Sequence, residues 1–139
     1  MTDISIDRFK QGHGRSYCQA LAEIRAGKKT SHWIWYIFPQ LRGLGRSGTS
    51  DYYGMEGIHE ARAYWEDALL RSHMVEILEA LLEQEAPIRE ILGPDSKKLR
   101  SSMTLFWLAT EADIFRQVLD KFYGGRLDYR TKEMLEGKR

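Results

Sequence analysis

One aromatic segment limits the folds open to this chain more than any other feature. Residues 31–48 read SHWIWYIFPQLRGLGRSG, and positions 33–38 contain two Trp, one Tyr and one Phe. Such residues favour a β-strand, but no other segment offers a convincing partner strand, and a lone strand leaves its backbone groups unpaired. Because a short helix satisfies its own backbone, we predict a mostly buried helix from about His32 to Ile37.

The residues on either side define the ends of this helix. Ser31 is suited to cap its start, and Pro39 disfavours helical geometry at the residue before it. A loop follows, in which Gly43, Gly45 and Gly48 allow the backbone to approach another group closely. The sequence therefore predicts that an apolar core ends here beside an adaptable loop.

The rest of the chain reads as a series of helices. A short first turn around Ile6 and Phe9 is expected to stop at Gly12 and Gly14. Helical patterns bounded by capping residues or glycines cover residues 16–26, 57–67, 69–84, 96–109 and 110–123, and a last short helix begins at Asp128. We predict an all-α fold, in which residues 1–139 form a single compact domain of about six to eight short helices without a significant sheet.

Composition and charge argue against several classes of protein. The net charge is +1, and basic residues are scattered among acidic ones, so neither nucleic acid nor a membrane surface is indicated as a partner. Cys18 is the single cysteine, which fits a reducing compartment, and no signal peptide or membrane-spanning run is recognisable. We therefore predict a cytoplasmic protein. The four histidines show no metal-ligand spacing, and no metal or cofactor is predicted.

Five polar residues are candidates for binding a phosphate. Arg46 and Ser47 lie in the glycine-rich loop, where backbone N–H groups and a guanidinium favour anions. Lys98 precedes Ser101 by three residues, so the two lie roughly on one helix face, and Lys29 precedes the aromatic segment. Each also has an ordinary structural interpretation, since lysines pair with helix ends and a buried serine commonly bonds the carbonyl one turn back.

Three further residues are candidates for contacting or transforming a ligand. His32 is the candidate catalytic acid or base, because histidine titrates near neutral pH. Trp33 and Tyr53 are candidates for stacking against a ring. The competing interpretations are that His32 bonds a backbone carbonyl at a helix start, and that the aromatic rings simply form the core.

Several stretches together resemble a known bacterial family. The signature is KKTSHWIWYIFPQLRGLGRS, followed by YGM at 53–55, EARAY at 60–64, DSKKLRSSMTLF at 95–106 and VLDKF at 118–122. This pattern is similar to that of the family called domain of unknown function 1810, although residues 66–74 depart from it where members usually carry a His-Pro step. The resemblance implies an all-helical single domain and no settled reaction. A more distant similarity to the NADAR superfamily implies chemistry on ADP-ribose derivatives.

Two functional hypotheses follow. In the first, a nucleotide or ADP-ribose-like phosphorylated small molecule binds near residues 29–53 and 98–104, and an N-glycosidic bond is hydrolysed there. In the second, the chain is a non-catalytic helical binding or regulatory domain whose protein partner is unknown. The two differ in whether the deepest pocket is walled by both of those segments together or the segments are packed solid.

Overall fold

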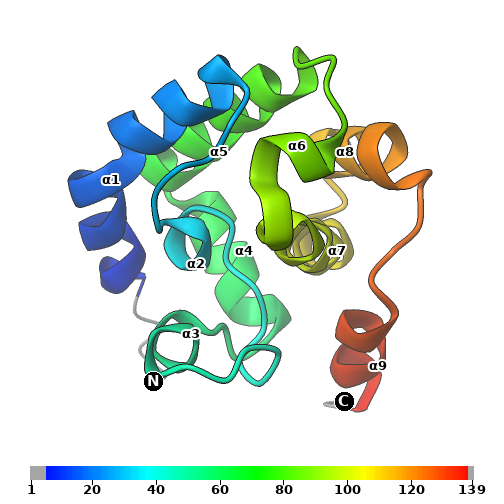
Figure 1. Ribbon diagram of the computed structural model, residues 1–139. Helices are drawn as coiled ribbons and strands as arrows, with labels where there is room; N and C mark the ends of the chain where they lie inside the picture. Colours follow the sequence, from blue (N-terminus) through cyan, green and yellow to red (C-terminus); the bar gives the residue numbers. More distant parts are fainter. Residues whose placement is uncertain (1–5, 138–139) are drawn as a thin grey trace.

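The predicted all-α architecture is confirmed by a computed structural model that describes residues 6–137 (Figure 1). The elements are α1 (Asp7–Ala26), α2 (Ile34–Ile37), α3 (Gly48–Tyr53), α4 (Ile58–Glu66), α5 (Ala68–Leu82), α6 (Ile88–Leu92), the 3-10 turn η1 (Gly93–Asp95), α7 (Ser96–Thr110), α8 (Asp113–Tyr123) and α9 (Tyr129–Gly137). Within the described residues there is no strand, and the β-type pairing is one isolated bridge between Leu41 and Met55.

The first helix runs without interruption through the glycines that were expected to stop it. The prediction of a break at Gly12 and Gly14 is therefore wrong, and α1 ends instead at Gly27, whose φ of 83° suits glycine. Gly12 has a different purpose. A Cβ at this position would lie 2.5 Å from Cδ1 of Tyr36, so the absence of a side chain lets α2 lie directly against α1.

The core is organised around α7, which is central in Figure 1. Its apolar side chains surround much of the helix, as its sequence predicted, and Leu99, Met103 and Phe106 are fully buried. Phe106 packs edge-on against Tyr64 of α4 at 5.3 Å and stacks with Phe115 of α8 at 5.2 Å. These ring contacts join α4, α7 and α8, whereas α1 packs against α5 and α2.

The aromatic segment forms a shorter helix than predicted. The helix α2 is a single turn that begins at Ile34, and Ser31 does not cap it. Instead, the Ser31 hydroxyl donates to the buried carboxylate of Glu23 on α1, as do the backbone N–H groups of Thr30 and Ser31 and the indole N–H of Trp33. Residues 30–33 are thus held against α1, which delays the start of the helix.

Glu23 remains ionised in this buried position. Burial by itself raises the pKa of the carboxyl, but donors from Ser31, Gln19, Thr30 and Trp33 outweigh it and hold the pKa well below its usual range. The carboxylate therefore serves as a charged anchor for the connection between α1 and α2.

A pair of histidines joins α1 to α5. The Nδ1 atoms of His13 and His73 lie 3.0 Å apart, and Nε2 of His13 lies 3.0 Å from the carbonyl oxygen of Tyr36. Because a carbonyl only accepts, Nε2 carries the proton of neutral His13, and its Nδ1 accepts from His73. Burial lowers the pKa of His13 to about 4, although the bond to Tyr36 opposes this shift. Both rings stack with Tyr17.

Replacing the Glu23 carboxylate should weaken the whole fold. Glu23→Gln places an NH₂ group among five donors and removes the charge that they bind, so the free energy of unfolding should fall by about 3 kcal/mol. Chemical denaturation measures this change. Glu79→Gln, on the exposed face of α5, is the control and should change stability by less than about 0.5 kcal/mol. Equal values for the two variants would contradict the anchoring role.

Acid should destabilise the protein through His13. Its pKa is lower in the folded state than in the unfolded chain, so between pH 6.5 and 4 the unfolded chain binds the extra proton and stability falls as the pH falls. The contribution is about 2 kcal/mol between pH 7 and 5. Denaturation across this range should give a flatter profile for His13→Gln than for the wild type, whereas the exposed His59→Gln should keep the wild-type slope. Parallel profiles for all three proteins would contradict this assignment.

Candidate functional site

A cavity of about 240 Å³ lies where the loop after α2 meets α7 and the start of α9. We call it the Gln40 cavity. Its lining residues are mainly hydrogen-bond donors, and they are Gln40, Leu44, Lys97, Lys98, Ser101, Asp128 and Arg130. Two of the predicted site residues, Lys98 and Ser101, are among them. Segments 29–53 and 98–104 thus both contribute to its wall, whereas the larger cavities of about 460, 600 and 620 Å³ are each walled by at most one of these segments.

Gln40 is the most informative residue of the cavity. It is only 5% exposed, and its Nε2 has no hydrogen-bond partner among residues 6–137. The backbone is fixed there, because the N–H of Met55 donates to the Gln40 carbonyl and the N–H of Arg42 donates to the Met55 carbonyl. Gly54 permits this close pairing, since a Cβ there would lie 2.5 Å from Cα of Arg42. A buried amide donor without a partner costs free energy, because the hydrogen bond that it makes to water in the unfolded chain is not replaced.

The lysines predicted to bind phosphate meet at a carboxylate. Nζ of Lys29 lies 2.8 Å from one oxygen of Asp95, and Nζ of Lys98 lies 2.8 Å from the other. Burial raises the pKa of Asp95, but the two lysines outweigh it and lower the pKa below its usual value. Lys29 is itself buried, and it also donates to the Ser31 carbonyl. It is therefore a structural cation, whereas Lys98 remains at the cavity wall.

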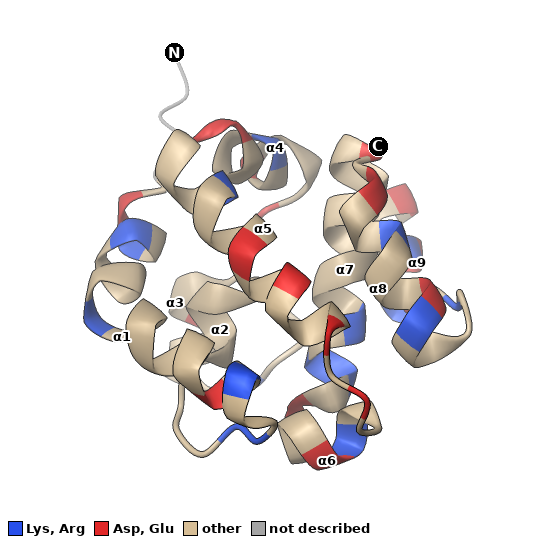
Figure 2. Ribbon diagram, turned by 90° about the horizontal axis from the view of Figure 1, so that it is seen from above, with Lys and Arg blue, Asp and Glu red and all other residues tan. Residues whose placement is uncertain are grey.

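The opposite wall comes from the start of α9. Asp128 is oriented by Thr131, whose N–H and hydroxyl both donate to Oδ2, and Oδ1 lies 3.8 Å from Arg100. Its charge is therefore already compensated. Arg130 is exposed beside it and, like Lys97, brings a positive charge to the cavity. Figure 2 shows Lys and Arg positions along α7 near α6.

One aromatic ring of the segment lies next to these groups. Trp35 is half-buried, and Nζ of Lys98 lies 5.4 Å from its ring centre. The glycine loop packs closely against the same ring. A Cβ at Gly45 would lie only 2.8 Å from Trp35 Cη2. The contact between Lys98 and Trp35 shows that the aromatic segment and the first turn of α7 are neighbours.

The other sequence-predicted residues lie elsewhere. Trp33 and Tyr53 are buried in the core, where Trp33 donates to Glu23 and Tyr53 accepts from Arg15. Ser47 caps α3 through a reciprocal bond with Ser50, so the second half of the predicted loop is helical. Arg46 and His32 are exposed and do not line the Gln40 cavity.

Five of the seven lining residues were not identified as site residues from the sequence, namely Gln40, Leu44, Lys97, Asp128 and Arg130. Gln40, Lys97 and Arg130 come from separate segments and form no local motif. The sequence did contain a signal for two of them. Lys97 adjoins the predicted site residue Lys98, and Gln40 follows Pro39 in the aromatic signature. Arg130 gave no signal, because only the position of α9 brings it to this wall.

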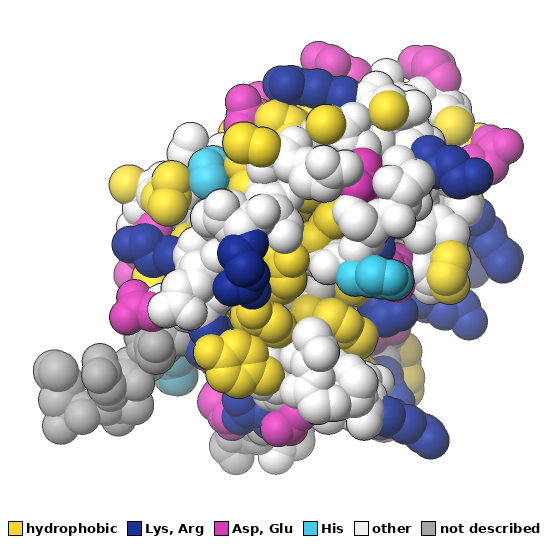
Figure 3. Space-filling view, turned by 60° about the vertical axis from the view of Figure 1, so that its left-hand side comes forward, with side chains coloured by type: hydrophobic (Ala, Val, Ile, Leu, Met, Phe, Trp, Pro, Cys, Tyr) yellow, Lys and Arg dark blue, Asp and Glu magenta, His cyan; other side chains and the backbone are white. Residues whose placement is uncertain are grey.

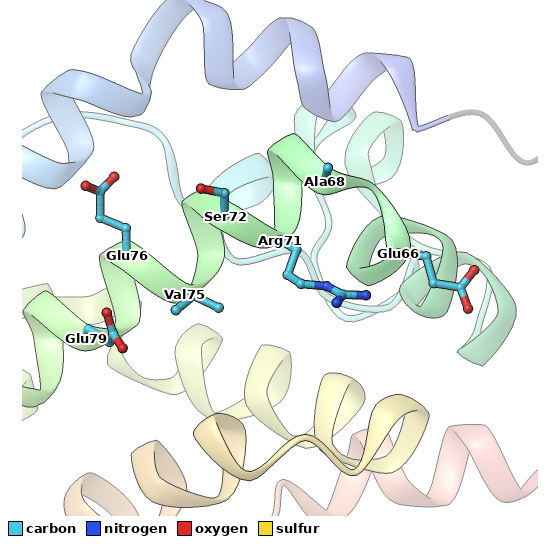
Figure 4. Close-up of a pocket in the computed structure, with 7 residues that line it drawn as sticks. All are labelled: Glu66, Ala68, Arg71, Ser72, Val75, Glu76 and Glu79. Carbon is cyan, nitrogen blue, oxygen red and sulfur yellow. The ribbon is translucent and has the colours of Figure 1, made fainter.

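A larger groove of about 620 Å³ follows the exposed side of α5 and is less convincing as a ligand site (Figure 4). Its charged side chains are Glu66, Arg71, Glu76 and Glu79, and two of these are already engaged. Arg71 donates to the Trp65 carbonyl, and Glu76 accepts from the Tyr17 hydroxyl. The groove therefore offers no convergent set of unpaired groups.

Other kinds of site find little support. Charges of both signs are mixed over the face shown in Figure 3, without a basic stripe. Among residues 6–137, no group of three or more His, Cys, Asp or Glu side chains is placed to hold a metal ion. None of the helices in that part of the chain combines the length and apolar character that crossing a membrane requires.

Comparison with known proteins places the chain in a family. The sequence pattern of the family described as "Protein of unknown function (DUF1810)" matches residues 3–135. The crystal structure of the conserved hypothetical protein Rv1873 from Mycobacterium tuberculosis is similar, with 42% identity over 94% of this chain and 95% of that one and a TM-score of 0.90. No curated protein matches the chain. Because the family pattern extends over nearly the entire sequence, the chain belongs to the DUF1810 family.

Proposed function

We propose that this protein binds a phosphorylated small molecule of the nucleotide or ADP-ribose class, with a phosphate in the Gln40 cavity. The observation that carries the proposal is the buried Nε2 of Gln40, which has no partner among the described residues. The groups beside it that can supply a hydrogen are the ammonium groups of Lys97 and Lys98 and the guanidinium of Arg130. Lys98 already donates to Asp95, whereas the Gln40 amide, Lys97 and Arg130 have no acceptor among the described residues, and a phosphate oxygen can supply one.

The charges around the cavity favour the same ligand. Lys98 and Lys29 share the single charge of Asp95, and Arg100 faces Asp128, whereas no acidic partner is seen for Lys97 or Arg130 within residues 6–137. An excess of positive charge therefore remains in a protein whose net charge is only +1. Such a local excess attracts a multiply charged anion. The cavity volume suits a phosphate group better than a complete nucleotide, for which pockets are larger.

Binding is better supported than cleavage of an N-glycosidic bond. A hydrolase of this kind needs a free carboxylate or a histidine at the bond that breaks. Both oxygens of Asp128 are engaged, and His32 is exposed away from the cavity. We therefore propose a binding protein. An additional measurement is whether a free base is released from the bound ligand, as cleavage of the N-glycosidic bond would require.

Gln40→Leu should separate function from stability. If Gln40 serves only the fold, its loss destabilises the protein, whereas removal of an unpaired buried donor should leave stability unchanged or raise it by about 1 kcal/mol. Denaturation of the unliganded protein measures this difference. A stability loss of more than about 1 kcal/mol would contradict the proposed role.

A thermal-shift experiment tests the ligand class. ADP-ribose, NAD, AMP and inorganic phosphate at about a hundred times the dissociation constant should each stabilise the protein by about 2.7 kcal/mol, which corresponds to a shift of several degrees. The shift should vanish in Gln40→Leu and decrease in Arg130→Gln. Lys132→Gln, at an exposed neighbouring position of α9, is the matched control and should behave as the wild type.

The outcomes distinguish the two functional hypotheses. A shift with the phosphate-containing ligands that depends on Gln40 supports the small-molecule site. No shift with any of them at millimolar concentration would refute it, and the non-catalytic helical domain with a protein partner would then be the better account.

A further inference from the structure

A second cavity, of about 460 Å³, lies on the other side of Lys97. We call it the α6–α8 cleft. It is lined by residues of α6, η1, α7 and α8, namely Ile88, Arg89, Gly93, Pro94, Ser96, Lys97, Arg100, Phe122 and Tyr123. It is large enough for a small organic ligand, unlike the Gln40 cavity.

The cleft combines positive charge with aromatic rings. Arg89, Lys97 and Arg100 contribute three cations, whereas the lining contains neither Asp nor Glu. Arg100 shares its charge with Asp128 at 3.8 Å, and its buried Nε has no partner within residues 6–137. Its guanidinium lies 5.9 Å from the ring centre of Tyr123. A planar anionic group suits such a wall.

The Tyr123 ring of the cleft is held in place. The Tyr123 hydroxyl donates to the Ser96 carbonyl, which ties the end of α8 to the first turn of α7. Burial raises the pKa of Tyr123 above its usual range, so the phenol stays neutral and keeps this bond. The aromatic wall is therefore preorganised rather than formed only when a ligand arrives.

The two cavities are adjacent grooves on one helix. On α7, Ser96 and Arg100 lie to one side of Lys97, and Lys98 and Ser101 lie to the other, as 3.6 residues per turn requires. Lys97 is exposed and lines both cavities. The Arg100–Asp128 pair connects them as well, since Arg100 lines the cleft and Asp128 lines the Gln40 cavity.

From this arrangement we infer that a single ligand occupies both cavities across Lys97. Its terminal phosphate lies in the Gln40 cavity, and its planar ring, together with a second anionic group, lies in the α6–α8 cleft. This inference rests on the proposed function and narrows its ligand to molecules with a ring and two negatively charged groups. A nucleoside diphosphate meets this description, whereas ribose 5-phosphate has neither a planar base nor a second anionic group.

Isothermal titration calorimetry with ADP and ribose 5-phosphate tests the inference. ADP should bind the wild type at least about tenfold more tightly than ribose 5-phosphate does. Arg89→Gln should lower the affinity for ADP about tenfold and leave ribose 5-phosphate unchanged, because Arg89 lines only the cleft of the two cavities. Arg89 is exposed, so the variant should fold, and thermal denaturation of the unliganded protein checks this. Arg126→Gln, at another exposed position, is the control.

Two more variants separate the cavities. Gln40→Leu should weaken both ligands, because it removes the common phosphate contact. Lys97→Gln should also weaken both, and more strongly for ADP, which Lys97 contacts on two sides. Equal affinities of the wild type for ADP and ribose 5-phosphate, or unchanged ADP binding in Arg89→Gln, would refute the two-cavity ligand while leaving the phosphate site intact. Failure of both ligands to bind the wild type would refute the proposed function as well.

Discussion

The buried carboxylate of Glu23 determines how the connection after α1 and the loop that contains Gln40 are placed. Five hydrogen bonds converge on it, and four of them come from residues 30–33. They hold the connection after α1 in one conformation, which in turn fixes where α2 begins and where the loop containing Gln40 emerges. Because the bonds are made to a charge in a buried site, they are individually stronger than neutral ones. A small helix of one turn gains from this anchor the rigidity that its own backbone bonds cannot supply.

Asp95 plays a comparable part at the start of α7. It lies between Lys29 and Lys98, and so links the end of the first connection to the helix that carries the site. The ion pairs are largely shielded from solvent, which makes them sensitive to the loss of either partner. Lys29 fixes the backbone, and Lys98 remains beside the Gln40 cavity.

The position of α7 gives both cavities a firm base. Its inner face is locked by ring contacts to α4 and α8, whereas its outer face carries Lys97, Lys98 and Arg100, which line the two cavities. Binding groups on a rigid helix keep their geometry better than groups on a loop. The glycine loop, in contrast, contributes Leu44 to the cavity wall and the close approach of Gly45 to Trp35, rather than an anion site of its own.

The sequence by itself determined most of the longer helices, because periodic apolar residues and capping signals act locally. The helix α7 and the stop at Gly27 were predictable in this way, whereas α3 and α6 were not, and the roles of Lys98 and Ser101 stay predictions. Gly12 misled the prediction, since only the approach of Tyr36 shows that this glycine serves packing. The burial of Trp33 and Tyr53, and the convergence of Gln40, Lys97 and Arg130, were decided by the tertiary structure. Those residues lie far apart in sequence, so their meeting depends on helix packing that no local pattern records.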